Sequence, residues 1–143
     1  MSGNFKKGKE TVIVELINEA RTKGVQCGNR YFEVTQPIMW NDKLGQVSLN
    51  HAIDMAKKDF LSHRGSDGST VKDRLSRVGY RWTTYGENVS RGYQSPGEVV
   101  KVWLKSKDHC KNMMNPNFKE AGSAYAKGSR EIYWTLILAS PDN

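Results

Sequence analysis

The stretch GSAYAKGSREIYWTLILA, residues 122–139, decides the fold class of this 143-residue chain. Its second half, Glu131 to Ala139, is rich in the aromatic and branched apolar residues that favour β-strands. The first half, Gly122 to Gly128, also fits a strand, and Gly128-Ser129-Arg130 has the composition of a turn. The sequence therefore predicts an antiparallel β-hairpin near the C-terminal end.

Four segments upstream of this hairpin have the apolar spacing or the cap residues of helices. They are a first helix that ends at Gly24, a long helix from Asn41 to about Ser62, a short helix from Thr70 to Val78, and a helix that starts at Ser95-Pro96. Residues 27–40 show no period and are expected to form an ordered loop, while residues 80–92 suggest a strand. Because the predicted helices precede the paired strands along the chain, the sequence predicts an α+β layered fold.

Length, composition and charge indicate one globular domain. We expect a flexible N-terminal lead-in over residues 1–9 and a single domain over residues 10–143. The net charge of +7 favours anionic partners, such as nucleic acid, anionic lipid or acidic wall polymers. No window approaches the ~20 apolar residues of a membrane span. Residues 1–9 lack the apolar region of a secretory signal, so the protein is either cytosolic or has lost a leader.

Three histidines and one glutamate are the candidates for chemistry. His63 stands between the long predicted helix and a glycine-rich turn, and His109 begins a short segment, so either could face a cleft. His51 is expected to be a core or helix-surface histidine with a hydrogen-bond partner. Glu87 would need a partner if it faced inward, and a histidine is the obvious one. The sequence contains no nucleophile elbow and no His-x-x-x-His or Cys-x-x-Cys spacing.

Several motifs, taken in order, resemble the bacterial branch of the CAP superfamily, which joins cysteine-rich secretory proteins, insect venom antigens and plant pathogenesis-related proteins. They include WNDKL at 40–44, HRGSDGS at 63–69, VGY at 78–80, GENV at 86–89, WLKS at 103–106, HCKN at 109–112 and NPNFKEAG at 115–122. The resemblance covers nearly the whole chain. It implies a three-layer α-β-α sandwich with a central antiparallel sheet, and secretion into the periplasm or the exterior through a leader absent from this chain.

The resemblance also implies a cleft with two histidines and two acidic residues, which in some members binds a divalent metal such as Zn²⁺. The matching positions are His63, Glu87 and His109, with the two histidines as metal ligands. Where the family pattern has its other glutamate, this chain has Ser106, so Asp67, or less favourably Glu120, is expected to supply the second carboxylate. Glu87 would then accept a hydrogen bond from one imidazole and fix its tautomer. In the alternative, the same groups form a polar network that joins the sheet to the helices.

The two cysteines allow one bridge or two free thiols by count alone. Bacterial proteins of similar sequence pair them, so the resemblance implies a disulfide between Cys27 and Cys110. Such a bond persists only in an oxidising compartment, which favours the periplasm or the exterior.

We therefore expect a secreted or periplasmic binding module whose cleft takes a divalent metal ion, a lipid or a cell-envelope component. One alternative is a metal-assisted hydrolase in which Glu87 or a histidine moves protons for a metal-activated water. Another is a cationic protein that binds polyanions through side chains such as Lys101, Lys105 and Arg74. Nucleic acid is disfavoured because no base-reading motif accompanies the charge.

Overall fold

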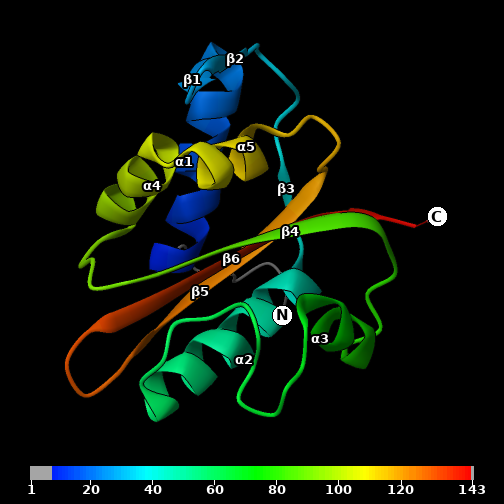
Figure 1. Ribbon diagram of the computed structural model, residues 1–143. Coiled ribbons are helices and arrows are strands. Elements are labelled where there is room, and N and C mark those ends of the chain that lie inside the picture. Colours follow the sequence, from blue (N-terminus) through cyan, green and yellow to red (C-terminus); the bar gives the residue numbers. More distant parts are fainter. Residues whose placement is uncertain (1–7, 143) are drawn as a thin grey trace.

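A central four-stranded sheet lies between two helical layers in the computed structural model, which describes residues 8–142 (Figure 1). In chain order the elements are α1 (Lys9–Lys23), β1 (Val25–Cys27), β2 (Arg30–Phe32), β3 (Met39–Trp40), α2 (Asp42–Lys58), α3 (Val71–Arg77), β4 (Trp82–Arg91), α4 (Pro96–Lys105), α5 (Lys107–Met114), β5 (Glu120–Lys127) and β6 (Ile132–Pro141). The expected lead-in falls mostly on residues 1–7, outside the described residues, and Lys9 already begins α1.

The predicted hairpin forms the middle of this sheet. The strand order is β3-β5-β6-β4, with β6 antiparallel to both β5 and β4. Helices cover both faces of the sheet, so β6 is buried from Ile132 to Ser140. This burial explains why the sequence of β6 is a nearly continuous apolar run. The two-residue strand β3 adds a parallel pair with β5 at one edge. The α+β sandwich is confirmed, with one short parallel strand added to its antiparallel sheet.

Helices α1, α4 and α5 lie on one face of the sheet, and α2 and α3 lie on the other (Figure 1). The core on the first face contains Trp103 and Trp134, and the core on the second contains Leu44 and Leu75. Helix α2 lies so close to β5 that a side chain at Gly122 would collide with the backbone of α2 at Gly45.

The cap residues set most helix starts as predicted. The Asn41 side chain accepts a hydrogen bond from the Leu44 backbone N–H, Thr70 caps α3, and Ser95 caps α4. The predicted end of the long helix near Ser62 was wrong, because Asp59 adopts a left-handed conformation (φ 55°) that ends α2 at Lys58.

Two further segments differ from the sequence prediction. The expected loop over residues 27–40 contains part of the β1-β2 hairpin and strand β3. Helix α5 was not predicted; it begins directly after α4, with Ser106 as the junction residue. Within residues 8–142, no helix is long and apolar enough to cross a membrane.

Candidate functional site

Three elements bring the predicted cleft residues to strand β4. Glu87 lies in the middle of β4, His63 lies in the connection between α2 and α3, and His109 lies on α5. Helix α5 is tied to β4 because the Asn88 side chain donates to the His109 carbonyl (3.1 Å) and the Asn112 side chain donates to the Glu87 carbonyl (3.3 Å). Burial lowers the pKa of His109, and the charge of nearby His63 lowers it further. His63 and His109 are thus both tied to residues 87–88 of β4.

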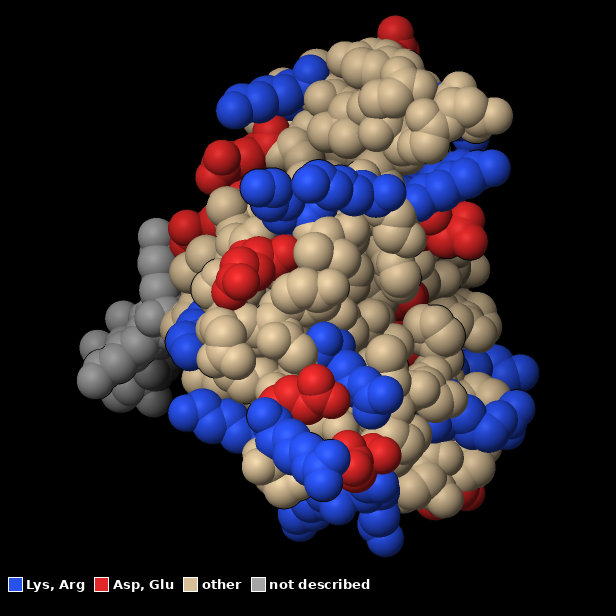
Figure 2. Space-filling model, turned by 60° about the vertical axis from the view of Figure 1, so that its left-hand side comes forward, with Lys and Arg blue, Asp and Glu red and all other residues tan. Residues whose placement is uncertain are grey.

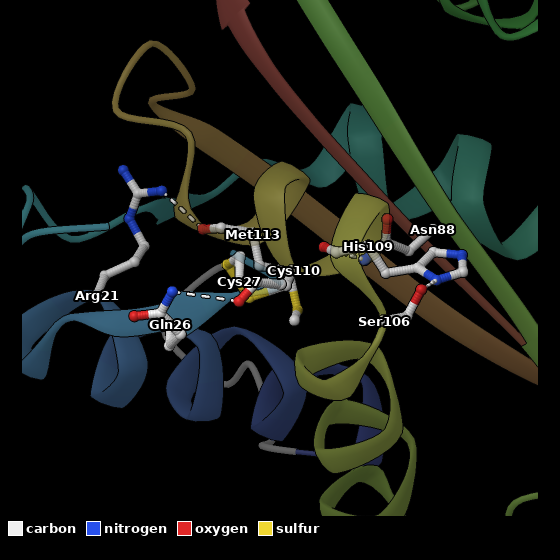
Figure 3. Close-up of a disulfide and its surroundings, with 9 residues drawn as sticks. Arg21, Gln26, Cys27, Asn88, Ser106, His109, Cys110 and Met113 are labelled. Carbon is white, nitrogen blue, oxygen red and sulfur yellow. Dashed lines mark hydrogen bonds between the residues drawn. A yellow bond between two sulfur atoms is a disulfide. The ribbon is translucent and has the colours of Figure 1, made fainter. Parts of the chain in front are cut away.

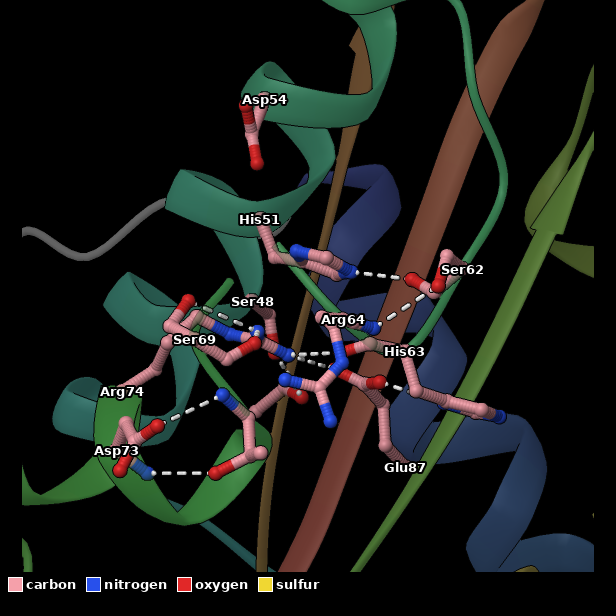
Figure 4. Close-up of polar contacts among 12 residues, drawn as sticks. Ser48, His51, Asp54, Ser62, His63, Arg64, Ser69, Asp73, Arg74 and Glu87 are labelled. Carbon is pink, nitrogen blue, oxygen red and sulfur yellow. Dashed lines mark hydrogen bonds and ion pairs between the residues drawn. The ribbon is translucent and has the colours of Figure 1, made fainter. Parts of the chain in front are cut away.

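Glu87 joins His63 to a buried arginine (Figure 4). One carboxylate oxygen accepts from His63 Nδ1 (2.7 Å), and the other accepts from Arg74 Nη2 (3.2 Å). The side chains of Glu87 and Arg74 are 2% and 8% exposed, whereas that of His63 is 61% exposed. The hydrogen bond to Glu87 raises the pKa of His63. Because a carboxylate only accepts, His63 carries its proton on Nδ1, and Nε2 is the nitrogen available to a ligand.

Arg74 also holds the chain segment on which His63 lies. Its guanidinium donates to the carbonyls of His63 (2.8 Å) and Ser69 (2.9 Å) as well as to Glu87. The polyanion hypothesis counted Arg74 among the surface cations, and that assignment was wrong because its side chain is buried. Sequence reasoning missed its role because an arginine in a short helix gives no sign of a buried partner on a later strand.

Ser106 takes a different role from the glutamate that the family pattern would place there. Its hydroxyl lies 2.8 Å from His109 Nδ1, at the junction of α4 and α5, and it makes no cap hydrogen bond to α5. A hydroxyl can donate or accept, so this contact allows His109 to present a bare Nε2 to a ligand.

Neither candidate for the second carboxylate bonds to the cleft residues. Asp67 accepts from the Ser69 backbone N–H and from Arg77, both at 2.9 Å, and these hydrogen bonds lower its pKa. Glu120 instead accepts from the Tyr80 hydroxyl (2.7 Å). Among the described residues, no group of three or more His, Cys, Asp and Glu side chains is arranged to hold a metal ion. The protein ligands available to a metal ion here are therefore the imidazoles of His63 and His109.

His51 supports the connection that leads to His63 (Figure 4). It is buried, and its Nε2 lies 2.7 Å from the Ser62 carbonyl, to which it can only donate. Burial lowers its pKa, which favours the neutral form. This is the hydrogen-bonded core histidine that the apolar stripe predicted.

The disulfide between Cys27 and Cys110 is confirmed (Figure 3). Both cysteines are fully buried, and the bridge joins β1 to α5 directly beside His109. It therefore anchors the helix that carries one of the two candidate histidines.

An apolar groove lies apart from the candidate histidines, between α1 and α4. Its volume is about 340 Å³, and its charged lining residues are Glu19, Lys23 and Lys101. The apolar lining residues are Leu16, Ala20, Val25, Val100 and Leu104. Basic side chains elsewhere do not merge into one patch on the face shown in Figure 2, where acidic side chains lie between them.

Comparison with known proteins shows which family this chain resembles over most of its length. The model of the cysteine-rich secretory protein family, CAP, matches residues 14–138. YkwD of Bacillus subtilis is 30% identical over 126 residues, which are 88% of this chain and 45% of YkwD. The B. subtilis membrane protein YlbC is 28% identical over 85 residues, which are 59% of this chain and 25% of YlbC. The chain thus spans less than half the length of these curated relatives.

Solved structures show the same fold at low sequence identity. An extracellular protein containing a SCP domain from Bacillus anthracis has a TM-score of 0.78 at 23% identity, covering 93% of this chain and 40% of that chain. An outer surface protein from Borrelia burgdorferi also has a TM-score of 0.78, at 19% identity, covering 92% of both chains. The structure of NaASP2 with Zn²⁺ has a TM-score of 0.68 at 13% identity, covering 96% of this chain and 86% of that chain.

Proposed function

The chain belongs to the cysteine-rich secretory protein family, and we propose that it acts outside the cytoplasm as a binding module whose cleft holds a divalent metal ion between His63 and His109. The disulfide supports this location, since such bonds persist in oxidising compartments. The extracellular B. anthracis protein and the B. burgdorferi outer surface protein share the fold and agree with it.

The hydrogen bond from His63 to Glu87 is the observation that carries the metal proposal. Metal-ligating histidines usually donate their second ring N–H to a carboxylate, which fixes the tautomer and raises the basicity of the ligating nitrogen. His63 has this arrangement at 2.7 Å, and its imidazole is exposed. Arg74 compensates the Glu87 charge, so Glu87 would act as the acceptor behind the histidine rather than as a ligand.

Two imidazole nitrogens suit a divalent metal ion of intermediate softness, and they leave some of its coordination positions open. Imidazole suits zinc, copper and nickel, and NaASP2 has been solved with Zn²⁺. With two protein ligands, the remaining positions would be open to water or to an oxygen of a bound ligand. A bound ion would supply Lewis acidity at this position. His63 and His109 would hold it, and Glu87 and Ser106 would orient the two rings.

Zinc titration by calorimetry tests this proposal. We expect one Zn²⁺ to bind the native protein, and we expect binding to disappear in the H63A/H109A double variant. Glu87→Gln should weaken binding by roughly 10- to 100-fold, because it removes the acceptor that orients His63. Asp67→Asn is the matched carboxylate control and should leave the affinity unchanged. Thermal unfolding of each variant separates loss of the site from loss of the fold.

The same titration at different pH values adds an independent readout. Ligating histidines must be neutral, so protons compete with zinc. Glu87 raises the pKa of His63. Zinc affinity should therefore fall as the pH drops through this raised pKa, and in Glu87→Gln the fall should begin at lower pH. Absence of zinc binding by the native protein, or equal binding by the double variant, would refute the proposal.

The apolar groove favours a second binding function, for an amphiphile with an anionic head and an apolar chain. The groove between α1 and α4 has an apolar lining that includes Leu16 and Leu104. Its charged lining residues, Lys23 and Lys101 against Glu19, leave one net positive charge. A fluorescent fatty acid such as cis-parinaric acid should bind with a rise in emission. Leu104→Lys should abolish this rise, because it places a charge in the apolar lining. Leu61→Lys, at an exposed leucine outside the groove, is the control, and equal emission with both variants would exclude the groove.

A further inference from the structure

Two helices are attached to the outer edge of β4 by side-chain hydrogen bonds. Strand β4 lies at one edge of the four-stranded sheet, so its outer carbonyls have no neighbouring strand within residues 8–142. The Glu87 carbonyl accepts instead from the Asn112 side chain of α5 at 3.3 Å, and the Val89 carbonyl accepts from the Trp103 indole N–H of α4 at 3.4 Å. Carbonyls of alternate strand residues point the same way, so α4 and α5 attach along one edge of β4.

Asn88 adds a second connection between β4 and α5 (Figure 3). This residue is fully buried, and its side-chain nitrogen donates to the His109 carbonyl at 3.1 Å. Its side-chain oxygen accepts from the Asn112 side chain at 2.9 Å. Asn88 and Asn112, which we call the amide clamp, thus hold one turn of α5, from His109 to Asn112, against two successive residues of β4.

The two candidate histidines reach β4 from opposite faces of the sheet. Side chains of successive strand residues alternate between the two faces. Glu87 therefore points toward α3, where it contacts His63 and Arg74, whereas Asn88 points toward α5, which carries His109. On the first face, Glu87 and Arg74 fix His63. On the second face, the amide clamp decides where α5, and with it the His109 ring, lies relative to β4.

The disulfide cannot replace the clamp in this role. It joins α5 to β1, and β1 belongs to the two-stranded sheet rather than to the sheet that contains β4. Strand β4 itself is held by antiparallel pairing with β6 over residues 84–91. If the clamp is lost, α5 can therefore shift while β4 and the His63 side stay in place.

We propose that Asn88 and Asn112 are positioning residues that set the separation of the His63 and His109 rings, and through it the fit of a divalent metal ion between them. This inference rests on the proposed metal function and extends it from the two ligating rings to the amides behind one of them. Neither amide is a ligand, because both act through the backbone of α5.

Zinc titration by calorimetry tests the clamp. Asn112→Leu keeps a side chain of similar size and removes both of its hydrogen bonds. We expect zinc affinity to fall roughly 10- to 100-fold, the usual effect of losing a group behind a metal ligand, but not below the affinity of His109→Ala. Asn112→Gln keeps an amide donor and should recover part of the affinity. Asn50→Leu, at an exposed asparagine of α2, is the matched control, and thermal unfolding checks the fold of each variant.

Nuclear magnetic resonance of the metal-free protein gives a readout that does not need zinc. The ring signals are assigned by their loss in H63A and in H109A, and they are recorded at alkaline pH, where both rings are neutral. Asn112→Leu should shift the His109 ring signals and leave those of His63 in place. Met113→Leu, a change of buried apolar shape on the same helix, should shift neither.

The two readouts separate this proposal from the metal function. If the native protein binds no zinc, the metal function fails, and the ring signals alone decide whether the clamp positions His109. Unchanged His109 signals in Asn112→Leu, or equal shifts of both rings, would overturn the proposal. Native zinc affinity in Asn112→Leu would overturn it as well.

Discussion

Arg21→Met should lower the free energy of unfolding by about 4 kcal/mol, because it removes a buried cation that satisfies four backbone carbonyls. The guanidinium donates to the carbonyls of Gln36 (2.7 Å), Met113 (2.8 Å), Asn115 (3.0 Å) and Phe118 (3.2 Å). Arg21 is fully buried, and burial lowers its pKa. Methionine keeps much of the apolar stem but leaves these acceptors without their donor.

This arginine joins three parts of the chain that are far apart in sequence. It ties α1 to the loop before β3 and to the 113–118 segment at the end of α5. Urea unfolding followed by circular dichroism measures the effect. Arg21→Lys should recover only a small part of the loss, because an ammonium cannot reproduce the planar fork of donors.

A surface arginine is the matched control for this prediction. Arg130 is exposed in the turn between β5 and β6, and Arg130→Met should change stability by less than about 0.5 kcal/mol. A loss below about 1 kcal/mol in Arg21→Met would mean that the four carbonyls find other donors, and it would refute the role given to Arg21.

Removing the disulfide in a C27A/C110A variant should cost about 4.5 kcal/mol of stability. The bridge joins residues 83 apart in sequence, and the chain-entropy model assigns that cost to the freedom regained by the unfolded chain. Its removal also frees α5 from β1, so hydrogen exchange should accelerate in α5 more than in the β5-β6 hairpin.

Two measurements accompany this variant. Thiol titration of the native protein without reductant should find no reactive thiol, because both cysteines are in the bridge. Urea unfolding of the variant gives the stability change, and zinc titration reports whether His109 is still positioned. Native stability in C27A/C110A would contradict the anchoring role of the bridge.

Local patterns predicted much of the backbone. The hairpin followed from two apolar segments around Gly128-Ser129-Arg130, and three helix starts followed from Asn41, Thr70 and Ser95, each of which bonds within its own first turn. The end of α2 could not be predicted this way, because Asp59 has no strong local signal for a left-handed conformation and its side chain accepts from distant Tyr133.

The histidine partner expected for Glu87 is present, whereas its second partner was not expected. His63, Glu87 and His109 were identified from motifs, but the contact between His63 and Glu87 spans 24 residues of chain. Arg74, placed on the surface by its charge, proved to be the second partner of Glu87. Asp67 and Glu120, considered for the cleft, bond elsewhere because Arg77 and Tyr80 lie closer to them.

The sequence by itself determined the fold class, the family and the pair of cysteines, and it singled out three candidate site positions, because periodicity, caps and motif order are properties of neighbouring residues. Only the tertiary structure decided that Arg21 reaches Phe118 across 97 residues, that Arg74 compensates Glu87, and that Asn88 and Asn112 hold α5 against β4. The physical reason is that a buried polar group takes whichever partner the packing brings within hydrogen-bond distance, and packing depends on the whole chain.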